Sequence, residues 1–134
     1  MKQTTIMPFL LMLLLATAQA VAAEGDARLL CAANATHDCG EVGPCAQGSA
    51  ESIGIPGFFR IDFKNKLVTA RLDDGSENTS RIENTYVTDD RIALQGAENG
   101  LAWSMAIMRQ DGDMVIAAVG DGVGYVIHGS CIVP

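Results

Sequence analysis

The chain contains few cations: nine lysines and arginines stand against 16 aspartates and glutamates, and the formal net charge is −7. An acidic protein of this kind repels phosphate backbones and anionic lipid surfaces. We therefore expect no nucleic acid among its partners.

Long hydrophobic runs are also scarce. The main apolar run, residues 6–18, follows Lys2 and leads into small-x-small sites at residues 18–20 and 20–22. It is too short to span a bilayer comfortably, and its flanks are typical of a secretory signal peptide. We assign residues 1–23 to a signal peptide, with a membrane anchor as the alternative, and expect no stable membrane insertion after cleavage. Arg-Leu-Leu before Cys31 argues against a lipid anchor.

The chain has only four cysteines, which is an even number. Cys31, Cys39, Cys45 and Cys131 all follow the predicted signal peptide. An even count in a small exported domain predicts two disulfides and a periplasmic or secreted location. Zinc is disfavoured because seven and five residues separate the first three cysteines, whereas zinc sites use Cys-x-x-Cys pairs or nearby histidines. His37 does stand near the cysteines, but an oxidising location favours disulfides over zinc. We expect neither a metal nor a cofactor.

Helical periodicity is absent after residue 45, and turns recur between short apolar runs. This pattern predicts an all-β antiparallel meander of about eight strands in residues 46–134. A small up-and-down barrel would remove exposed edges, and a two-layer β-sandwich is the alternative. Residues 24–45 lack a strand pattern and are expected to form a cysteine-bearing N-terminal arm. The predicted strands are 46–52 (weak), 58–63, 66–72, 79–87, 91–96 and three within 101–131.

In the first clearly predicted hairpin, residues 58–72, the alternation of side chains shows which residues share a face. A two-residue turn at Lys64 and Asn65 places the odd-numbered residues of 58–63 on one face with the even-numbered residues of 66–72. Ile82, Tyr86, Ile92 and Leu94 are expected to point inward from the next two strands.

Two turns containing Asp-Gly organise residues 101–131. Taking residues 110–112 and 120–122 as three-residue loops pairs Met105 with Ala117 and Ala117 with Tyr125. Two faces follow from side-chain alternation. The predicted inner face holds Trp103, Met105, Ile107, Val115, Ala117, Val119, Val123, Tyr125 and Ile127.

The interior has two interpretations. Trp103, Met105 and Tyr125 are the candidate interior residues, and a small barrel either fills its centre with side chains or holds one small ligand. Small side chains at Ala70, Gly96 and Ala117 would leave room for such a ligand. A filled core is the simpler interpretation, because a domain of this size needs its large side chains for packing.

The other face of the same strands is unusually apolar for a surface left in water. An exposed apolar patch of this kind indicates a binding surface or a face covered by the N-terminal arm. The candidate partner face consists of Ala106, Met108, Met114, Ile116 and Val126.

Catalytic and metal motifs are weak. His128 and Ser130 share a strand face, but the chain has no Gly-x-Ser-x-Gly motif and no obvious third catalytic group. The carboxylates of Asp111, Asp113 and Asp121 gather near two turns without the spacing of a calcium loop. We therefore predict no catalytic and no metal site.

Disulfide connectivity follows from the predicted barrel. If residues 46–52 were the first strand, its start would lie beside the end of the last strand, which pairs Cys45 with Cys131. Cys31 would then pair with Cys39 inside the arm. The alternative pairs Cys39 with Cys45 and Cys31 with Cys131, and suits a barrel closed by the segment around Leu29 and Leu30.

Five segments, spread over most of the mature chain, are the basis of a resemblance to known proteins: CGEVGPC, FFRIDFKNKLVTA, ALQG, GLAWSMAI and GYVIHGSC. With them, the chain resembles a group of small exported bacterial proteins, of the proteobacterial type, that has no assigned activity. In size and meander it is also similar to periplasmic hydrolase inhibitors and lipocalin-like binders, which is a likeness of architecture alone. These features favour a non-enzymatic protein-binding or inhibitor-like module whose partner is an envelope protein. The alternative is a carrier that holds a small apolar ligand in the barrel interior.

Overall fold

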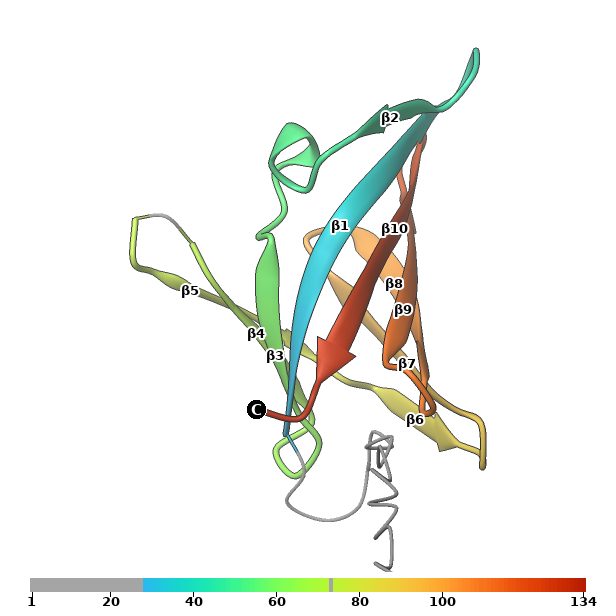
Figure 1. The fold of residues 1–134 in the computed structure, drawn as a ribbon. Helices are drawn as coiled ribbons and strands as arrows, with labels where there is room; N and C mark the ends of the chain where they lie inside the picture. Colours follow the sequence, from blue (N-terminus) through green and yellow to red (C-terminus); the bar gives the residue numbers. More distant parts are fainter. Residues whose placement is uncertain (1–27, 73) are drawn as a thin grey trace, which may run out of the picture.

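The computed structural model describes residues 28–72 and 74–134, so the predicted signal peptide lies outside the described residues. They form one ten-stranded antiparallel sheet in the order β5-β4-β3-β1-β10-β9-β8-β7-β6, with β2 beside β1. The predicted all-β antiparallel meander is thus confirmed, and the sheet curls into a partly closed barrel (Figure 1). The strands are β1 (Arg28–Gly40), β2 (Ala46–Gly48), β3 (Phe58–Asp62), β4 (Leu67–Arg71), β5 (Glu77–Arg81), β6 (Asn84–Val87), β7 (Arg91–Glu98), β8 (Leu101–Met108), β9 (Asp113–Gly120) and β10 (Val123–Ile132).

Helices contribute little to this fold. The short 3₁₀ helix η1 (Glu51–Ile53) follows β2. In the described part of the chain, no helix is long and apolar enough to cross a membrane.

The first strand of the barrel is β1, which occupies most of the predicted arm. It pairs with β10 from Leu30 to Gly40, with a bulge between Ala33 and Ala35, and on its other side with β3 and then β2. Leu29 and Cys31 on its inner side are 0% exposed, so this segment belongs to the core. The expectation of an irregular arm is therefore wrong for residues 28–40; residues 41–45 have no regular structure, and residues 24–27 lie outside the described residues. The predicted strand at 46–52 is reduced to the three residues of β2, followed by η1.

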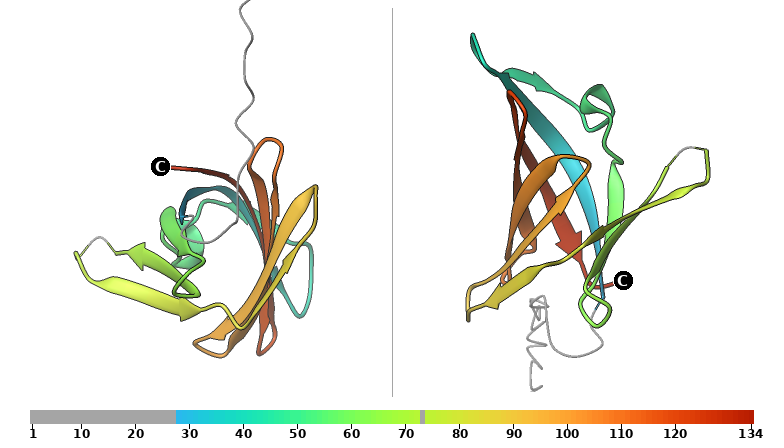
Figure 2. Two further views of the ribbon diagram at one scale, coloured as in Figure 1. Left: turned by 90° about the horizontal axis from the view of Figure 1, so that it is seen from below. Right: turned by 180° about the vertical axis from the view of Figure 1, so that it is seen from behind.

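Residues 77–87 cross from one edge of the sheet to the other and so bring the two edges together at one point. The first half, β5, pairs with β4, and the second half, β6, pairs with β7. At the crossing, Ile82 N donates to Lys66 O and Glu83 N donates to Gln95 O. Figure 2 shows this segment running between the two halves of the sheet, with β5 and β6 pointing to opposite sides. Beyond the crossing, β5 and β7 diverge.

The first hairpin has the predicted register. Phe59 pairs with Ala70 and Ile61 pairs with Val68. Asp62 fixes the turn, because its carboxylate accepts hydrogen bonds from the backbone N and the side-chain Nδ2 of Asn65. These bonds hold the pKa of Asp62 below its ordinary value, and the nearby Arg28 guanidinium adds to the effect.

The register of β9 differs by one residue from the prediction on both sides. Ile107 pairs with Met114 instead of Val115, because Gly112 N donates to Met108 O and closes a longer turn with Gly112 at a φ of +78°. On the other side, Val123 pairs with Gly120 across a two-residue turn. A slip of one residue moves every side chain of a strand to the opposite face. The two shifts compensate each other between β8 and β10, whose side chains therefore point as predicted. Only the side chains of β9 point to the face opposite the predicted one.

The core follows from the observed registers. Ile92, Leu94, Met105 and Ile107 are buried as expected, and Ile82 is 2% exposed. Tyr86 is 68% exposed, which contradicts its predicted inward position, because β6 pairs Tyr86 with Ala93 on the outer side. The central cluster of buried side chains consists of Leu29, Cys31, Phe59, Ile61, Ala70, Ile82, Ile92, Leu94, Met105, Ile107, Met114, Ile116, Ile127 and Cys131.

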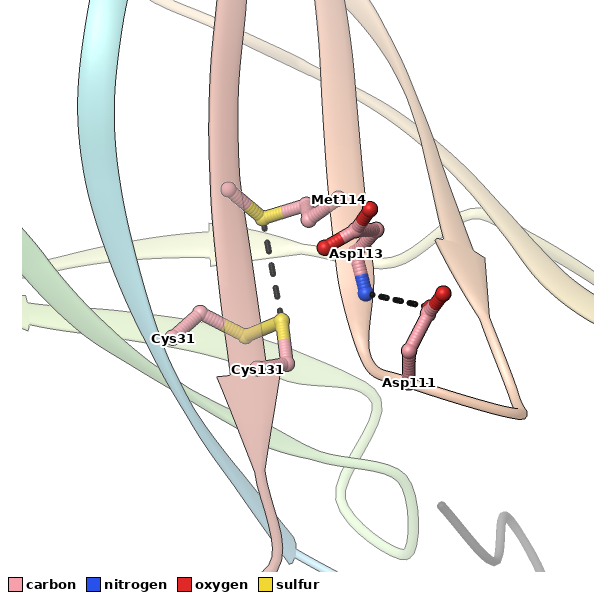
Figure 3. The surroundings of a disulfide bond; sticks show 5 residues. All are labelled: Cys31, Asp111, Asp113, Met114 and Cys131. Carbon is pink, nitrogen blue, oxygen red and sulfur yellow. Dashed lines mark hydrogen bonds between the residues drawn. A yellow bond between two sulfur atoms is a disulfide. The ribbon is translucent and has the colours of Figure 1, made fainter. Parts of the chain in front are cut away.

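The disulfides join Cys31 to Cys131 and Cys39 to Cys45. The predicted pairs Cys45–Cys131 and Cys31–Cys39 are therefore wrong, and the alternative pairing is present. Cys31 and Cys39 lie eight residues apart on β1, which separates them by about 26 Å along the strand. Cys31 lies directly opposite Cys131 in the β1–β10 ladder, and Met114 Sδ contacts Cys131 Sγ at 3.7 Å (Figure 3). Two disulfides indicate an oxidising, non-cytoplasmic environment.

Candidate ligand cavity

A cavity of about 300 Å³ lies inside the barrel, on the side where β5 and β7 diverge. Most of its wall is apolar and comes from the inner faces of β3, β4, β8, β9 and β10. Its remaining wall comes from β5, from the end of β7 with its turn to β8, and from η1 with the segment that leads to β3. The lining residues are Ile53, Gly54, Ile55, Pro56, Phe59, Val68, Ala70, Asn78, Ser80, Glu98, Asn99, Leu101, Trp103, Met105, Ile116, Ala118, Tyr125 and Ile127.

Trp103 occupies a fixed position on the cavity wall. Its indole Nε1 donates a hydrogen bond to Ser80 Oγ at 3.0 Å and so connects β8 to β5. Its cross-strand neighbour is Gly96, where an added Cβ would lie 2.4 Å from both the indole ring and Arg81 O. A side chain at this position would displace the ring, so glycine is required for the indole to lie against the backbone.

Ala118 separates two aromatic residues on the inner face. It pairs with Trp103 of β8 on one side and with Tyr125 of β10 on the other. The methyl side chain of Ala118 is 8% exposed and lines the cavity. A small residue between two large ones leaves unfilled space, which accounts for part of the cavity.

The segment that follows β2 covers one end of the cavity. The hydroxyl of Thr36, which is 0% exposed, donates to Ser49 O at 3.1 Å, and Ser52 Oγ donates to the same oxygen at 2.7 Å. Ile53 and Ile55 pack against the core from this segment. These contacts hold the segment over the barrel interior.

The candidate interior residues lie together in the structure. Trp103, Met105 and Tyr125 all line the cavity, and Met105 is 3% exposed. Of the small residues expected to leave room, Ala70 lines the cavity, whereas the space at Gly96 is taken by the Trp103 ring. Ala117 points outward, and Ala118 takes its place on the inner face.

The candidate partner face does not exist as predicted. Met114 and Ile116 are 1% and 9% exposed and belong to the core, because the register of β9 is shifted by one residue. Ala106, Met108 and Val126 remain on the outer face and are half-buried. The outward positions of β9 are held instead by Val115, Ala117 and Val119.

The residues weighed for catalysis and for calcium lie outside the cavity. His128 is exposed on the outer face, where its ring packs edge-on against His37 at a centroid distance of 5.8 Å. Asp111 accepts a hydrogen bond from Asp113 N, as an aspartate at the start of a turn commonly does (Figure 3). Among residues 28–72 and 74–134, no group of three or more His, Cys, Asp or Glu side chains could hold a metal ion.

Several lining residues had no signal in the sequence. Ile53 and Ile55 stand in a stretch rich in glycine and proline, which indicates only a connector. Glu98 precedes an Asn-Gly turn, where an acidic residue is unremarkable. Ile116 and Ala118 were excluded by the wrong register of β9. A four-residue turn before β9 would have identified both.

No protein-family model, no curated protein and no solved structure matches the chain. The resemblance to small exported bacterial proteins therefore stays a prediction from the sequence.

Proposed function

We propose that this protein is a non-enzymatic exported binding protein that holds a small apolar ligand inside its barrel, in the periplasm or outside the cell. The observation that carries the proposal is the cavity of about 300 Å³. Its volume lies at the lower end of the range for small-molecule sites, which combine a mainly apolar wall with a few polar groups. Small β-barrels hold a single ligand in this way.

The absence of catalysis is part of the same proposal. The described cavity wall contains neither histidine nor cysteine, and its one serine already accepts the indole hydrogen bond of Trp103. A nucleophile would need an adjacent base to become reactive. Binding without chemical conversion accounts for this set of residues.

Trp103 is the only tryptophan in the chain, and its position on the cavity wall makes it a reporter of binding. Titration with the neutral fluorophore N-phenyl-1-naphthylamine should enhance probe fluorescence and quench Trp103 by energy transfer. Decanol should displace the probe. A probe that neither quenches Trp103 nor responds to decanol would contradict the proposed function.

A matched pair of variants separates the cavity from the surface. Ala118→Leu fills the space between Trp103 and Tyr125 and should reduce probe binding at least tenfold. Ala117→Leu adds the same atoms to the exposed side of the same strand and should leave binding unchanged. Equal binding by both variants would place the probe outside the cavity.

A second candidate function is protein binding, as a partner-binding or inhibitor-like module of the cell envelope. It is favoured by Val115 and Val119, which are 40% and 58% exposed on the outer face of β9, next to Ala102 and Ala106. Val115→Lys with Val119→Lys should abolish capture of an envelope protein by the oxidised chain. Probe binding in the cavity should persist in that variant.

A further inference from the structure

The cavity wall carries charge of one sign only. Of the described residues that line it, Glu98 is the single charged one, and neither lysine nor arginine is among them. The other hydrogen-bonding groups on this side, Asn78, Ser80 and Asn99, come from β5 and from the turn after β7. The cavity therefore combines an apolar floor with one polar side that bears a carboxylate.

Glu98 continues a row that is otherwise apolar. The inward pairs of the β7–β8 hairpin are Ile92 with Ile107, Leu94 with Met105 and Gly96 with Trp103, and the next inward pair is Glu98 with Leu101. Glu98 is half-buried, and among the described residues the recorded partner of its carboxylate is Asn99 Nδ2, at 3.4 Å. Within residues 28–72 and 74–134, no recorded ion pair accompanies this long hydrogen bond to a neutral amide, so no described cation compensates the carboxylate.

The aromatic residues reinforce the preference for a positive group. Phe59, Trp103 and Tyr125 all contribute to the cavity wall. An organic cation is attracted to the faces of such rings, and it is attracted further by a nearby carboxylate. An anion gains neither interaction, and it is also opposed by the net charge of −7.

We infer that the ligand of this cavity is a small amphiphile whose polar end is an alkylammonium group beside Glu98, with its alkyl part in the apolar floor. This inference rests on the proposed ligand-binding function. The inference predicts that, among ligands with the same alkyl chain, the one with an ammonium head group binds most tightly.

The test compares decyltrimethylammonium, decanol and decanoate as competitors of N-phenyl-1-naphthylamine on the oxidised protein. The ammonium should bind on the order of tenfold more tightly than decanol, and decanoate should bind more weakly than decanol. In Glu98→Gln the advantage of the ammonium over decanol should fall below about twofold. Glu83→Gln removes the same charge from an exposed position outside the cavity and should preserve the advantage.

A salt titration of the parent protein supports the inference independently of any variant. Raising the ionic strength to about 0.5 M should weaken ammonium binding severalfold and leave decanol binding nearly unchanged, because salt screens partly exposed charges. If the probe neither quenches Trp103 nor is displaced by decanol or by the ammonium, the proposed ligand-binding function is wrong. If decanol binds but the ammonium has no advantage, or keeps it in Glu98→Gln, the inference about the charge is wrong and the binding function stands.

Discussion

Removal of the Cys31–Cys131 disulfide should cost far more stability than removal of Cys39–Cys45. The two bridges differ in the length of chain that they close: their sequence separations are 100 and 6 residues. In the chain-entropy model, the long bridge is worth about 4.7 kcal/mol and the short one about 2.3 kcal/mol at 25 °C. The short loop lies within the long one and shortens it by too little to change these values.

The location of the long bridge adds to its effect. Cys31 and Cys131 are 0% and 1% exposed, and their removal also takes away the sulfur contact to Met114. Domains of this size have unfolding free energies of about 5–15 kcal/mol. We therefore expect the Cys31→Ala/Cys131→Ala variant to be close to unfolded at room temperature.

Equilibrium urea unfolding provides the assay, followed by both Trp103 fluorescence and far-ultraviolet circular dichroism to check two-state behaviour. The Cys39→Ala/Cys45→Ala variant is the matched control, since it also removes two sulfurs and one bridge. Losses of equal size in the two variants would refute the reasoning from loop length. A long-bridge variant as stable as the parent would refute the assignment of that bridge to the core.

Three further predictions concern packing, register and pH. Gly96→Ala should displace the Trp103 ring, destabilise the domain by about 1–3 kcal/mol and shift the tryptophan emission, because the added methyl has no space. Val119→Asp should change the free energy of unfolding by less than about 0.5 kcal/mol, since Val119 is 58% exposed; a larger loss would indicate that Val119 points inward, in the register predicted from the sequence. The hydrogen bonds from Asn65 lower the pKa of Asp62, so this contribution is present at neutral pH and is lost as the pH falls below about 4. The stability difference between the parent and Asp62→Asn should therefore shrink in acid, as urea melts between pH 7 and pH 2 would show.

The sequence predicted the parts of the fold in which polar and apolar residues alternate. The hairpin of β3 and β4 has charged Arg60 and Asp62 between apolar neighbours, and its register was correct. The strand β9, in contrast, reads DMVIAAVG and is apolar on both faces. Its pattern fits either register equally well, so the turn lengths decide, and the prediction had both turns wrong by one residue.

The strand β1 could not be predicted from local preferences. Its residues RLLCAANATHDCG include three alanines and one each of asparagine, aspartate and glycine, residue types that are depleted in strands. Its structure comes from non-local pairing with β10, β3 and β2, together with the bridge from Cys31 to Cys131. The wrong disulfide pairing followed from this one error, because a different segment was taken as the first strand.

The candidate cavity was predicted in part. The alternation of β8 and β10 placed Trp103, Met105 and Tyr125 on the inner side. The covering segment at Ile53 and Ile55 depends on the path of the chain between β2 and β3, which has no periodic pattern. The position of Glu98 on the wall likewise depends on the divergence of β5 from β7.

The crossing of residues 77–87 gives the barrel two ends with different properties. Near the crossing, the interior is filled by Ile82, Ile92 and Ile107, and the buried disulfide with Met114 extends this packed region. None of these residues lines the cavity. Where β5 and β7 separate, none of the described strands closes the wall, and polar side chains meet an apolar floor. Substitutions at the packed end should therefore change stability without altering the cavity lining. The open end shares part of its wall with the core, because Phe59, Met105 and Ile127 belong to both.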